Sequence, residues 1–227
     1  MTRARVALAM LLAAWCAPAA AQTIDDRPTH RFDVSVGALW LGGAALGAEQ
    51  AELRANRLEP GPFMLFATDT RVEPVAGFDG RVGFWLTRAL LVEAGFIYGK
   101  PTVRTRVSSD AEGAEALTLE EDLDQYFIEA SGVFFIDALR FGRTVPFVSA
   151  GAGYLRQLHE GRTLVETGQV YHVGAGVRHW FVQRARGFIR AVGVRVDGRA
   201  YVLLSGFELD DDARSSGALS AGVFITF

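Results

Sequence analysis

The sequence has little lysine and almost no cysteine. Lys100 is the single lysine among 23 basic residues, and Cys16 is the single cysteine in 227 residues. The formal net charge is −3, which argues against a nucleic-acid-binding protein because such proteins carry a basic face. Half of the residues are apolar, which excludes a disordered chain. The length fits one domain, or two small ones at most.

Residues 1–21 have the three parts of a secretory signal peptide. Arg3 and Arg5 precede a short apolar run, and the small residues Ala19-Ala20-Ala21 follow it. Cys16 lies within this segment, directly after the bulky Trp15, which argues against a lipid-attachment site. The apolar run is too short for a membrane anchor. We therefore predict export, with a cysteine-free domain over residues 22–227.

Beyond residue 21 the apolar residues recur with a period of two, and no stretch is long enough for a helix to cross a bilayer. The first example places Phe32, Val34, Val36, Ala38 and Trp40 on one face of a strand. Eight segments alternate in this way: 31–41, 78–86, 90–98, 126–136, 146–157, 171–181, 188–202 and 217–227.

The connections between these segments alternate in length. Long polar segments lie near 42–77, 101–124, 157–168 and 203–215, and short ones near 87–89, 137–144 and 182–187. Long loops at one end and tight turns at the other are typical of an outer-membrane barrel. The fold class predicted is all-β, an eight-stranded antiparallel up-and-down transmembrane β-barrel. A soluble lipocalin-like barrel is the alternative, but its outer face would carry many lysines and glutamates.

The positions of the aromatic residues favour the membrane barrel. Those expected at the long-loop ends of the strands are Trp40, Phe78, Tyr98, Tyr126, Tyr154 and Tyr171. Those expected at the short-turn ends are Phe32, Phe84, Phe134, Phe181, Phe188 and Phe227. Two aromatic girdles around an aliphatic band are what a bilayer selects.

The C-terminal run 221–227, which ends on Phe227, resembles the last strand of bacterial outer-membrane proteins. The segment 145–154 is similar to a recurring strand of the eight-stranded group that includes the OmpA transmembrane domain and opacity-type proteins. This resemblance implies location in the outer membrane and an assembly signal at Val223, Ile225 and Phe227. It also implies contact with outer-membrane lipid, lipopolysaccharide and the barrel-assembly machinery, and we expect a monomer that binds no nucleic acid.

Charged residues also fall on the face expected to point inward. They are Asp33, Glu93, Glu129, Asp197, Arg81, Arg178, Arg195 and Arg199. Because an eight-stranded barrel has room only for side chains, and because buried charges persist when paired, we expect an ion-pair network that closes the lumen. The expected pairs are Arg81 with Glu93, and Glu129 with Arg195 or Arg178. A gate or polar solute path is the alternative.

Two acidic clusters lie in predicted outer loops, one between Asp110 and Asp124 and one between Glu208 and Asp212. Carboxylates suit divalent cations, but the spacing matches no EF-hand loop, and we predict solvated loops. The loop that contains the first of these clusters, residues 101–124, is expected to be exposed and dispensable for folding.

Candidate residues for catalysis are His159, His172, Ser149 and Glu160, but their spacing does not demand a triad. We predict no enzyme activity, no cofactor and no metal site. The function expected is a structural or surface-interaction role. A small-solute conduit and a lipid A-modifying enzyme are the alternatives.

Overall fold

The computed structural model describes residues 31–53, 63–109, 111, 114–158, 165–184, 187–204 and 214–227. The predicted signal peptide, the acidic cluster 208–212, and His159 and Glu160 lie outside these residues. Within them, no helix is long and apolar enough to cross a membrane.

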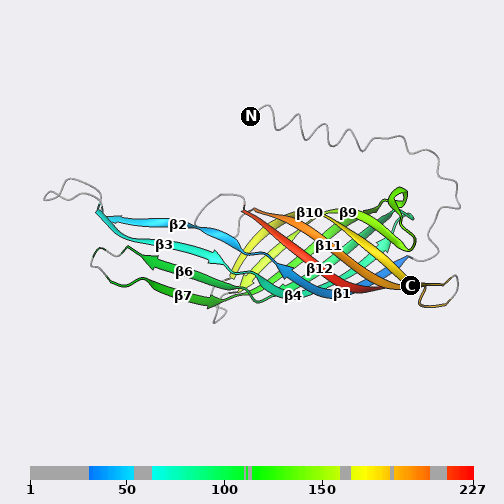
Figure 1. Cartoon of the computed structure of the whole chain (residues 1–227), viewed down its shortest axis with the longest axis horizontal. Coiled ribbons are helices and arrows are strands. Elements are labelled where there is room, and N and C mark those ends of the chain that lie inside the picture. The colour runs from blue at the N-terminus through cyan, green and yellow to red at the C-terminus, as the bar shows by residue number, and fades with distance from the viewer. Residues whose placement is uncertain are drawn as a thin grey trace, which may run out of the picture.

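Eight antiparallel strands form a closed barrel (Figure 1). They are β1 (Phe32–Leu41), β4 (Val75–Trp85), β5 (Leu90–Gly99), β8 (Asp124–Phe135), β9 (Thr144–Leu158), β10 (Val165–Gln183), β11 (Ala191–Leu204) and β12 (Arg214–Thr226). Each of these strands pairs with the barrel strand that follows it in the sequence. β1 pairs with β12 and so closes the ring, with Val36 opposite Val223. The predicted eight-stranded up-and-down barrel is confirmed.

The alternation of side chains produces an apolar outer face. In β1, Phe32 is 57% exposed and Val34 is 41% exposed, whereas Asp33 between them is 1% exposed. Two of the rings expected at the long-loop end, Tyr98 and Tyr126, lie 5.0 Å apart. At the other end Phe32 lies 5.4 Å from Phe84. An outer face of this kind suits lipid rather than water.

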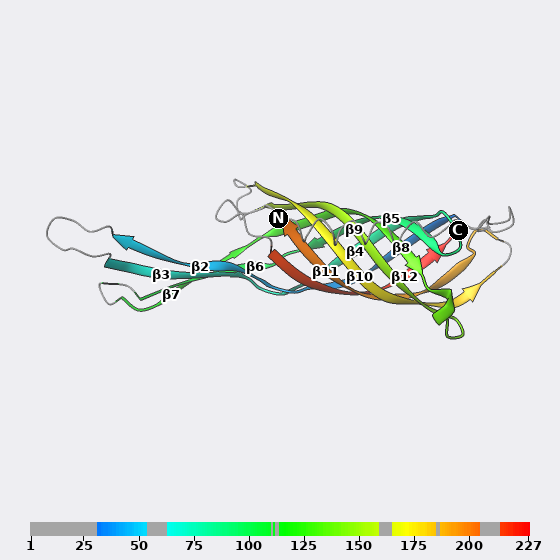
Figure 2. The ribbon, with the colours of Figure 1, turned by 90° about the horizontal axis from the view of Figure 1, so that it is seen from above.

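The two long segments 42–77 and 101–124 are not simple loops. They contain four further strands: β2 (Ala44–Leu53), β3 (Phe63–Val72), β6 (Thr102–Ser108) and β7 (Leu117–Asp122). These form a second sheet in the order β2-β3-β6-β7, which we call the extension. It projects from the long-loop end of the barrel, as the two perpendicular views in Figures 1 and 2 show.

The prediction of loops was wrong here. The strands of the extension do alternate polar with apolar residues, but their many charged residues were interpreted as solvated loops. The run Val103-Arg104-Thr105-Arg106-Val107 has period two and β-branched residues at alternate positions. Its partner on β3 places Arg71 opposite Arg104. The segment 101–124 is therefore one hairpin of a sheet.

Some strand ends also differ from those predicted. β10 begins at Val165, six residues before the predicted start, and continues the ladder with β9 through the pair Val165–Leu158. β11 begins at Ala191 rather than at residue 188. Gly187 has a φ of 117°, which turns the chain before that strand.

Candidate functional site

The interior of the barrel holds one continuous network of ion pairs. Asp33 receives a bidentate contact from Arg178, at 2.9 and 3.0 Å. Arg178 also reaches Glu93 at 2.9 Å, and Glu93 is bound by Arg195 at 2.6 Å. These four side chains come from β1, β10, β5 and β11, so the network ties together walls on different sides of the barrel.

The network continues toward the other side chains on the inner face. Asp197 accepts from Arg195 at 2.7 Å and lies 2.6 Å from Arg199. Arg199 reaches Asp79 at 2.6 Å. Arg81 contacts Asp79 at 3.0 Å and also pairs with Glu129. All eight predicted charged residues are thus brought together, each at most 5% exposed.

Two details of this network differ from the expected pairing. Glu129 contacts Arg81, and Arg199 at 3.7 Å, rather than Arg195 or Arg178. Those two arginines converge instead on Glu93. Arg81 does approach Glu93, at 3.7 Å. Strand stagger in a closed barrel decides which inward residues share a level, and the sequence does not show that stagger.

Asp79 is a ninth member that the sequence analysis did not include. It is 5% exposed and connects Arg81 to Arg199. The signal for it was present, because residues i and i+2 of a strand share a face and Asp79 precedes Arg81 by two. Neutral side chains complete the hydrogen bonding: the Tyr201 hydroxyl donates to Glu129 at 3.1 Å, and Thr226 Oγ1 to Asp33 at 2.9 Å.

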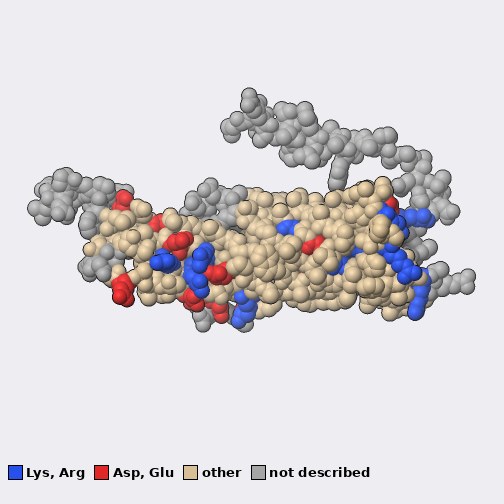
Figure 3. All heavy atoms as spheres, in the orientation of Figure 1, with Lys and Arg blue, Asp and Glu red and all other residues tan. Residues whose placement is uncertain are grey.

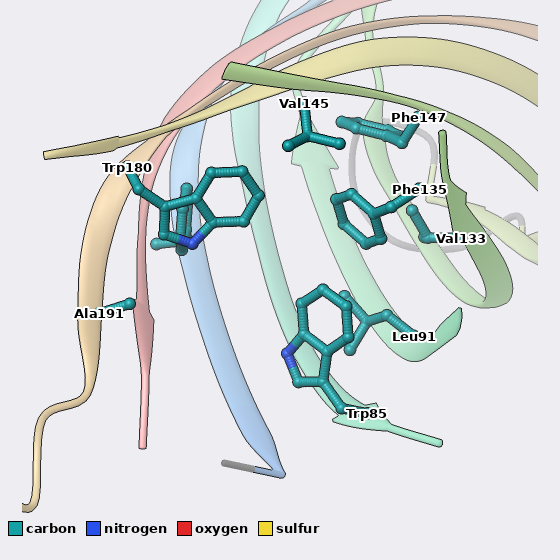
Figure 4. Close-up of a cluster of buried hydrophobic side chains, with 9 residues drawn as sticks. Trp85, Leu91, Val133, Phe135, Val145, Phe147, Trp180 and Ala191 are labelled. Atoms are coloured by element: carbon teal, nitrogen blue, oxygen red, sulfur yellow. The ribbon is translucent and has the colours of Figure 1, made fainter. Parts of the chain in front are cut away.

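An apolar cluster lies on the short-turn side of the network. Its members are Trp85, Leu91, Val133, Phe135, Val145, Phe147, Trp180, Ala191 and Phe224. Figure 4 shows these side chains converging on the barrel interior from several strands. The Arg178 guanidinium lies 4.6 Å from the ring centroid of Phe224, and that of Arg195 lies 4.7 Å from Phe147. The charged layer is therefore packed directly on an aromatic layer.

A second apolar cluster lies on the long-loop side. It consists of Leu39, Leu41, Ile97, Phe127, Leu155, Val170, Tyr201 and Ala218. The lumen is thus filled in three layers: apolar, charged and apolar. Beside the network lies a cavity of about 10 Å³, lined by Arg81, Arg195 and Ser220 among others. Such a volume is at the lower limit for holding one water molecule.

Close backbone approach makes room for these large inner side chains. A Cβ atom on Gly151 would lie 2.5 Å from His172 Cε1 and 2.8 Å from Ser131 Oγ. A Cβ atom on Gly176 would lie 2.5 Å from the Asp197 Cβ. Glycines on the inner face therefore sit opposite the bulky and charged residues that fill the lumen.

His172 does not pair with Ser149, the partner considered from the sequence. His172 Nε2 lies 3.2 Å from Ser131 Oγ, and its Nδ1 lies 3.4 Å from Glu129 Oε2. This order of serine, histidine and carboxylate resembles a nucleophilic triad. However, Ser131 and His172 are 4% and 3% exposed, and the Tyr201 ring lies 5.3 Å from the imidazole ring, between centroids. In the part of the chain that the structure describes, this serine is therefore enclosed by neighbouring side chains.

The extension carries a second polar site, outside the barrel. Arg104 contacts Glu120 at 2.7 Å and Glu73 at 3.2 Å, and Arg71 contacts Glu73 at 3.1 Å. On the same face lies a groove of about 390 Å³, lined by Asp69, Arg71, Arg104, Arg106, Thr118 and Glu120. Among the described residues, no group of three His, Cys, Asp or Glu side chains is arranged to hold a metal ion.

The opposite face of the extension is apolar. Met64 and Phe66 on β3 are 39% and 38% exposed, and Leu117 and Leu119 on β7 are 58% and 55% exposed. Counting in steps of two, Val103 lies on the same face as the inward residues of β5, and Leu123 lies on the same face as those of β8. The apolar face of the extension therefore continues the lumen-facing side of the barrel wall, and the charged face continues the outer side.

No protein-family model and no curated protein matches the sequence. Solved structures do share the fold. Neisserial surface protein A is 18% identical, with 86% of this chain and 97% of that chain covered and a TM-score of 0.50. The outer membrane protein OprG from Pseudomonas aeruginosa is 10% identical, with 90% and 99% covered and a TM-score of 0.50. What these structures share with the chain is the fold, a closed eight-stranded antiparallel β-barrel. The exposed apolar side chains around this barrel suit contact with lipid.

Proposed function

We propose that the protein is a closed outer-membrane barrel that presents its extension at the cell surface, in a structural or surface-interaction role. The observation that carries this proposal is the filled lumen. Nine charged side chains occupy its middle layer, five acids and four arginines. Apolar side chains occupy both layers around them.

The filling argues against a conduit through the barrel. A water path would have to break contacts such as Arg178–Asp33 and Arg195–Glu93, which span the lumen from β10 to β1 and from β11 to β5. Removing one partner from a buried pair leaves an uncompensated charge, which costs about 3–5 kcal/mol. Passage would also require displacement of the aromatic layer on the short-turn side.

The extension supports the surface role. It offers a charged face with a groove and an apolar face with exposed Phe66 and Leu117, both beyond the long-loop girdle. Exposed apolar surface with a polar counterpart is typical of interaction sites. In this proposal the protein works as a monomer, with lipopolysaccharide around it and the barrel-assembly machinery as its partner during insertion.

The proposal includes no catalysis. The Ser131–His172–Glu129 arrangement has the order of a triad, but the contact between His172 and Glu129 is 3.4 Å long without a hydrogen bond, and the three side chains are buried in the lumen. A nucleophile has to reach its substrate as well as its base. We therefore assign His172 and Ser131 to the packing and hydrogen bonding of the interior.

The proposal is tested by the conductance of the purified protein in planar bilayers. The expected result is no steady ion current from the wild type. A matched comparison is the Glu93→Ala variant, which removes the carboxylate between Arg178 and Arg195 and should show intermittent current if it still folds. A large, persistent open-channel current from the wild type would overturn the closed lumen and favour a conduit.

A further inference from the structure

The surface at the short-turn end of the barrel is mainly positive, unlike the surface of the extension, where acidic and basic side chains are mixed. Six described arginines lie there: Arg31, Arg88, Arg140, Arg143, Arg184 and Arg190. Asp137 is the one acidic side chain among the described residues of that end outside the lumen. Figure 3 shows mainly blue at this end and mixed red and blue on the extension. We call these six residues the arginine collar.

The collar differs from the arginines of the extension in its partners. Arg71 and Arg104 are neutralised by Glu73 and Glu120. In the collar, Arg140 pairs with Asp137 at 2.9 Å, whereas Arg143 donates through Nη1 to a neutral partner, the carbonyl oxygen of Phe181, at 2.8 Å. With six arginines and one acidic side chain among its described residues, this end of the barrel carries a net positive charge.

Exposed aromatic side chains alternate with the collar arginines along the chain. Phe141 lies between Arg140 and Arg143 and is 86% exposed. Phe188 lies between Arg184 and Arg190 and is 82% exposed. These are the two most exposed large apolar side chains that the structure describes. The two phenylalanines have the same setting. Each lies in a turn next to a glycine with positive φ, Gly142 or Gly187, and is flanked by arginines in the sequence.

The two turns lie at the same end of the barrel and belong to neighbouring strand pairs. They connect β8 to β9 and β10 to β11, and β9 pairs with β10. The Phe188 ring also packs at a tilt against that of Phe227, with 5.0 Å between the ring centroids, within the short-turn girdle. Aromatic rings of this girdle mark the boundary between hydrocarbon and headgroups. The arginines beside them consequently lie at the depth of the lipid phosphates.

We propose that the arginine collar binds the phosphate groups of anionic phospholipids in the periplasmic leaflet. The exposed phenylalanines enter the acyl-chain boundary, and the guanidinium groups donate to phosphate oxygens, a pairing that arginine geometry favours. The inference rests on the membrane location of the barrel but not on the closed lumen. It commits to phospholipid headgroups because the collar surrounds apolar side chains that a soluble anion would leave in water.

The test uses the mature protein folded into phosphatidylcholine bilayers with spin-labelled phospholipids. The wild type should enrich phosphatidylglycerol over phosphatidylcholine in its first lipid shell by several-fold, since each basic residue near an anionic surface adds up to about fivefold. The variant with Arg140, Arg143, Arg184 and Arg190 all changed to Gln should lose most of this preference. High salt should weaken the preference of the wild type.

The matched control neutralises Arg71, Arg104 and Arg106 on the extension and should keep the wild-type preference. If the fourfold variant fails to fold, the pair Arg31→Gln with Arg184→Gln should still lower the preference. An equal preference in wild type and collar variants would overturn the proposal. Saturable binding of inorganic phosphate in neutral detergent, or binding to purified peptidoglycan, without any lipid preference would also overturn it, in favour of a soluble or polymeric anion.

Discussion

At the scale of single residues, Glu93 is the centre of the lumen network. It is 1% exposed and contacts Arg195 at 2.6 Å, Arg178 at 2.9 Å and Arg81 at 3.7 Å. The Glu93→Ala substitution leaves these arginines without their shared carboxylate. We expect a loss of about 3–5 kcal/mol in the free energy of unfolding, measured by denaturant titration in detergent micelles.

The control for this substitution is Glu120→Ala on the extension. Glu120 also binds an arginine, Arg104, at 2.7 Å, but its side chain is 54% exposed. Water screens such a pair, so the expected loss is about 0–1 kcal/mol. Equal losses in the two variants would show that the lumen pairs are no more important to stability than surface pairs.

The face of each lumen residue could be predicted from the sequence, but its partner could not. A period of two places Glu93 and Glu129 inward without further information. The partner depends on the relative heights of strands that are distant in the ring, and Glu129 on β8 therefore meets Arg81 rather than Arg195. The apolar layers were also missed, since Trp85 and Trp180 were assigned to strands without a role in closing the lumen.

At the scale of elements, the extension is separable from the barrel. The barrel strands pair with each other up to the point where the extension begins. There the backbone nitrogen of Gly42 donates to the Gly217 carbonyl oxygen, and that of Leu123 donates to the Pro101 carbonyl oxygen. We expect that replacing residues 44–72 and 102–122 together by short turns leaves a folded barrel. Heat-modifiable migration on gels measures this.

Removing one hairpin alone should behave differently, which revises the expectation that the segment 101–124 is dispensable for folding, because its strand β6 pairs with β3. Loss of 102–122 only would leave β3 without the six partners that pair with Ala67 to Val72. An unpaired strand edge promotes association between molecules, so a lower folding yield and aggregation are expected. Failure of the double replacement to fold would show that the extension supports the barrel.

The terminal strand carries another prediction. The Phe227 ring packs at a tilt against that of Phe188, with 5.0 Å between centroids, and its backbone nitrogen donates to the Phe32 carbonyl oxygen at 2.9 Å, beside the β1–β12 closure. If this residue, with Val223 and Ile225, is the assembly signal, Phe227→Asp should reduce the amount inserted in the outer membrane, measured by fractionation. Phe227→Tyr is the control, because it keeps the ring, and its level should stay near that of the wild type.

The elements that the sequence predicted well are those with one uniformly apolar face, such as β1 and β12. Lipid imposes that face, so the alternation is unbroken over the whole strand. The strands of the extension lie outside the apolar belt and mix charged with apolar residues, as in Leu117-Thr118-Leu119-Glu120. Their pairing depends on contacts between two segments separated by a complete barrel hairpin, β4–β5, which local sequence patterns do not report.

At the scale of the whole molecule, charge and shape define two different ends. One end carries the extension with its paired charges, and the other carries the arginine collar with the chain terminus Phe227. Barrels of this type place short turns in the periplasm and long connections outside the cell. The extension should therefore face the medium, and the collar should face the periplasm.

Single cysteines test this orientation, because the sequence after residue 21 contains no cysteine. Thr118 on β7 and Gln183 at the end of β10 are both exposed and uncharged, and they lie at opposite ends of the molecule. A membrane-impermeant maleimide added to intact cells should label Thr118→Cys and leave Gln183→Cys unlabelled. Both should be labelled after the outer membrane is permeabilised, because each side chain is accessible to water in the folded protein. The reverse pattern in intact cells would place the arginine collar in the outer leaflet and so would contradict both the orientation and the phospholipid proposal.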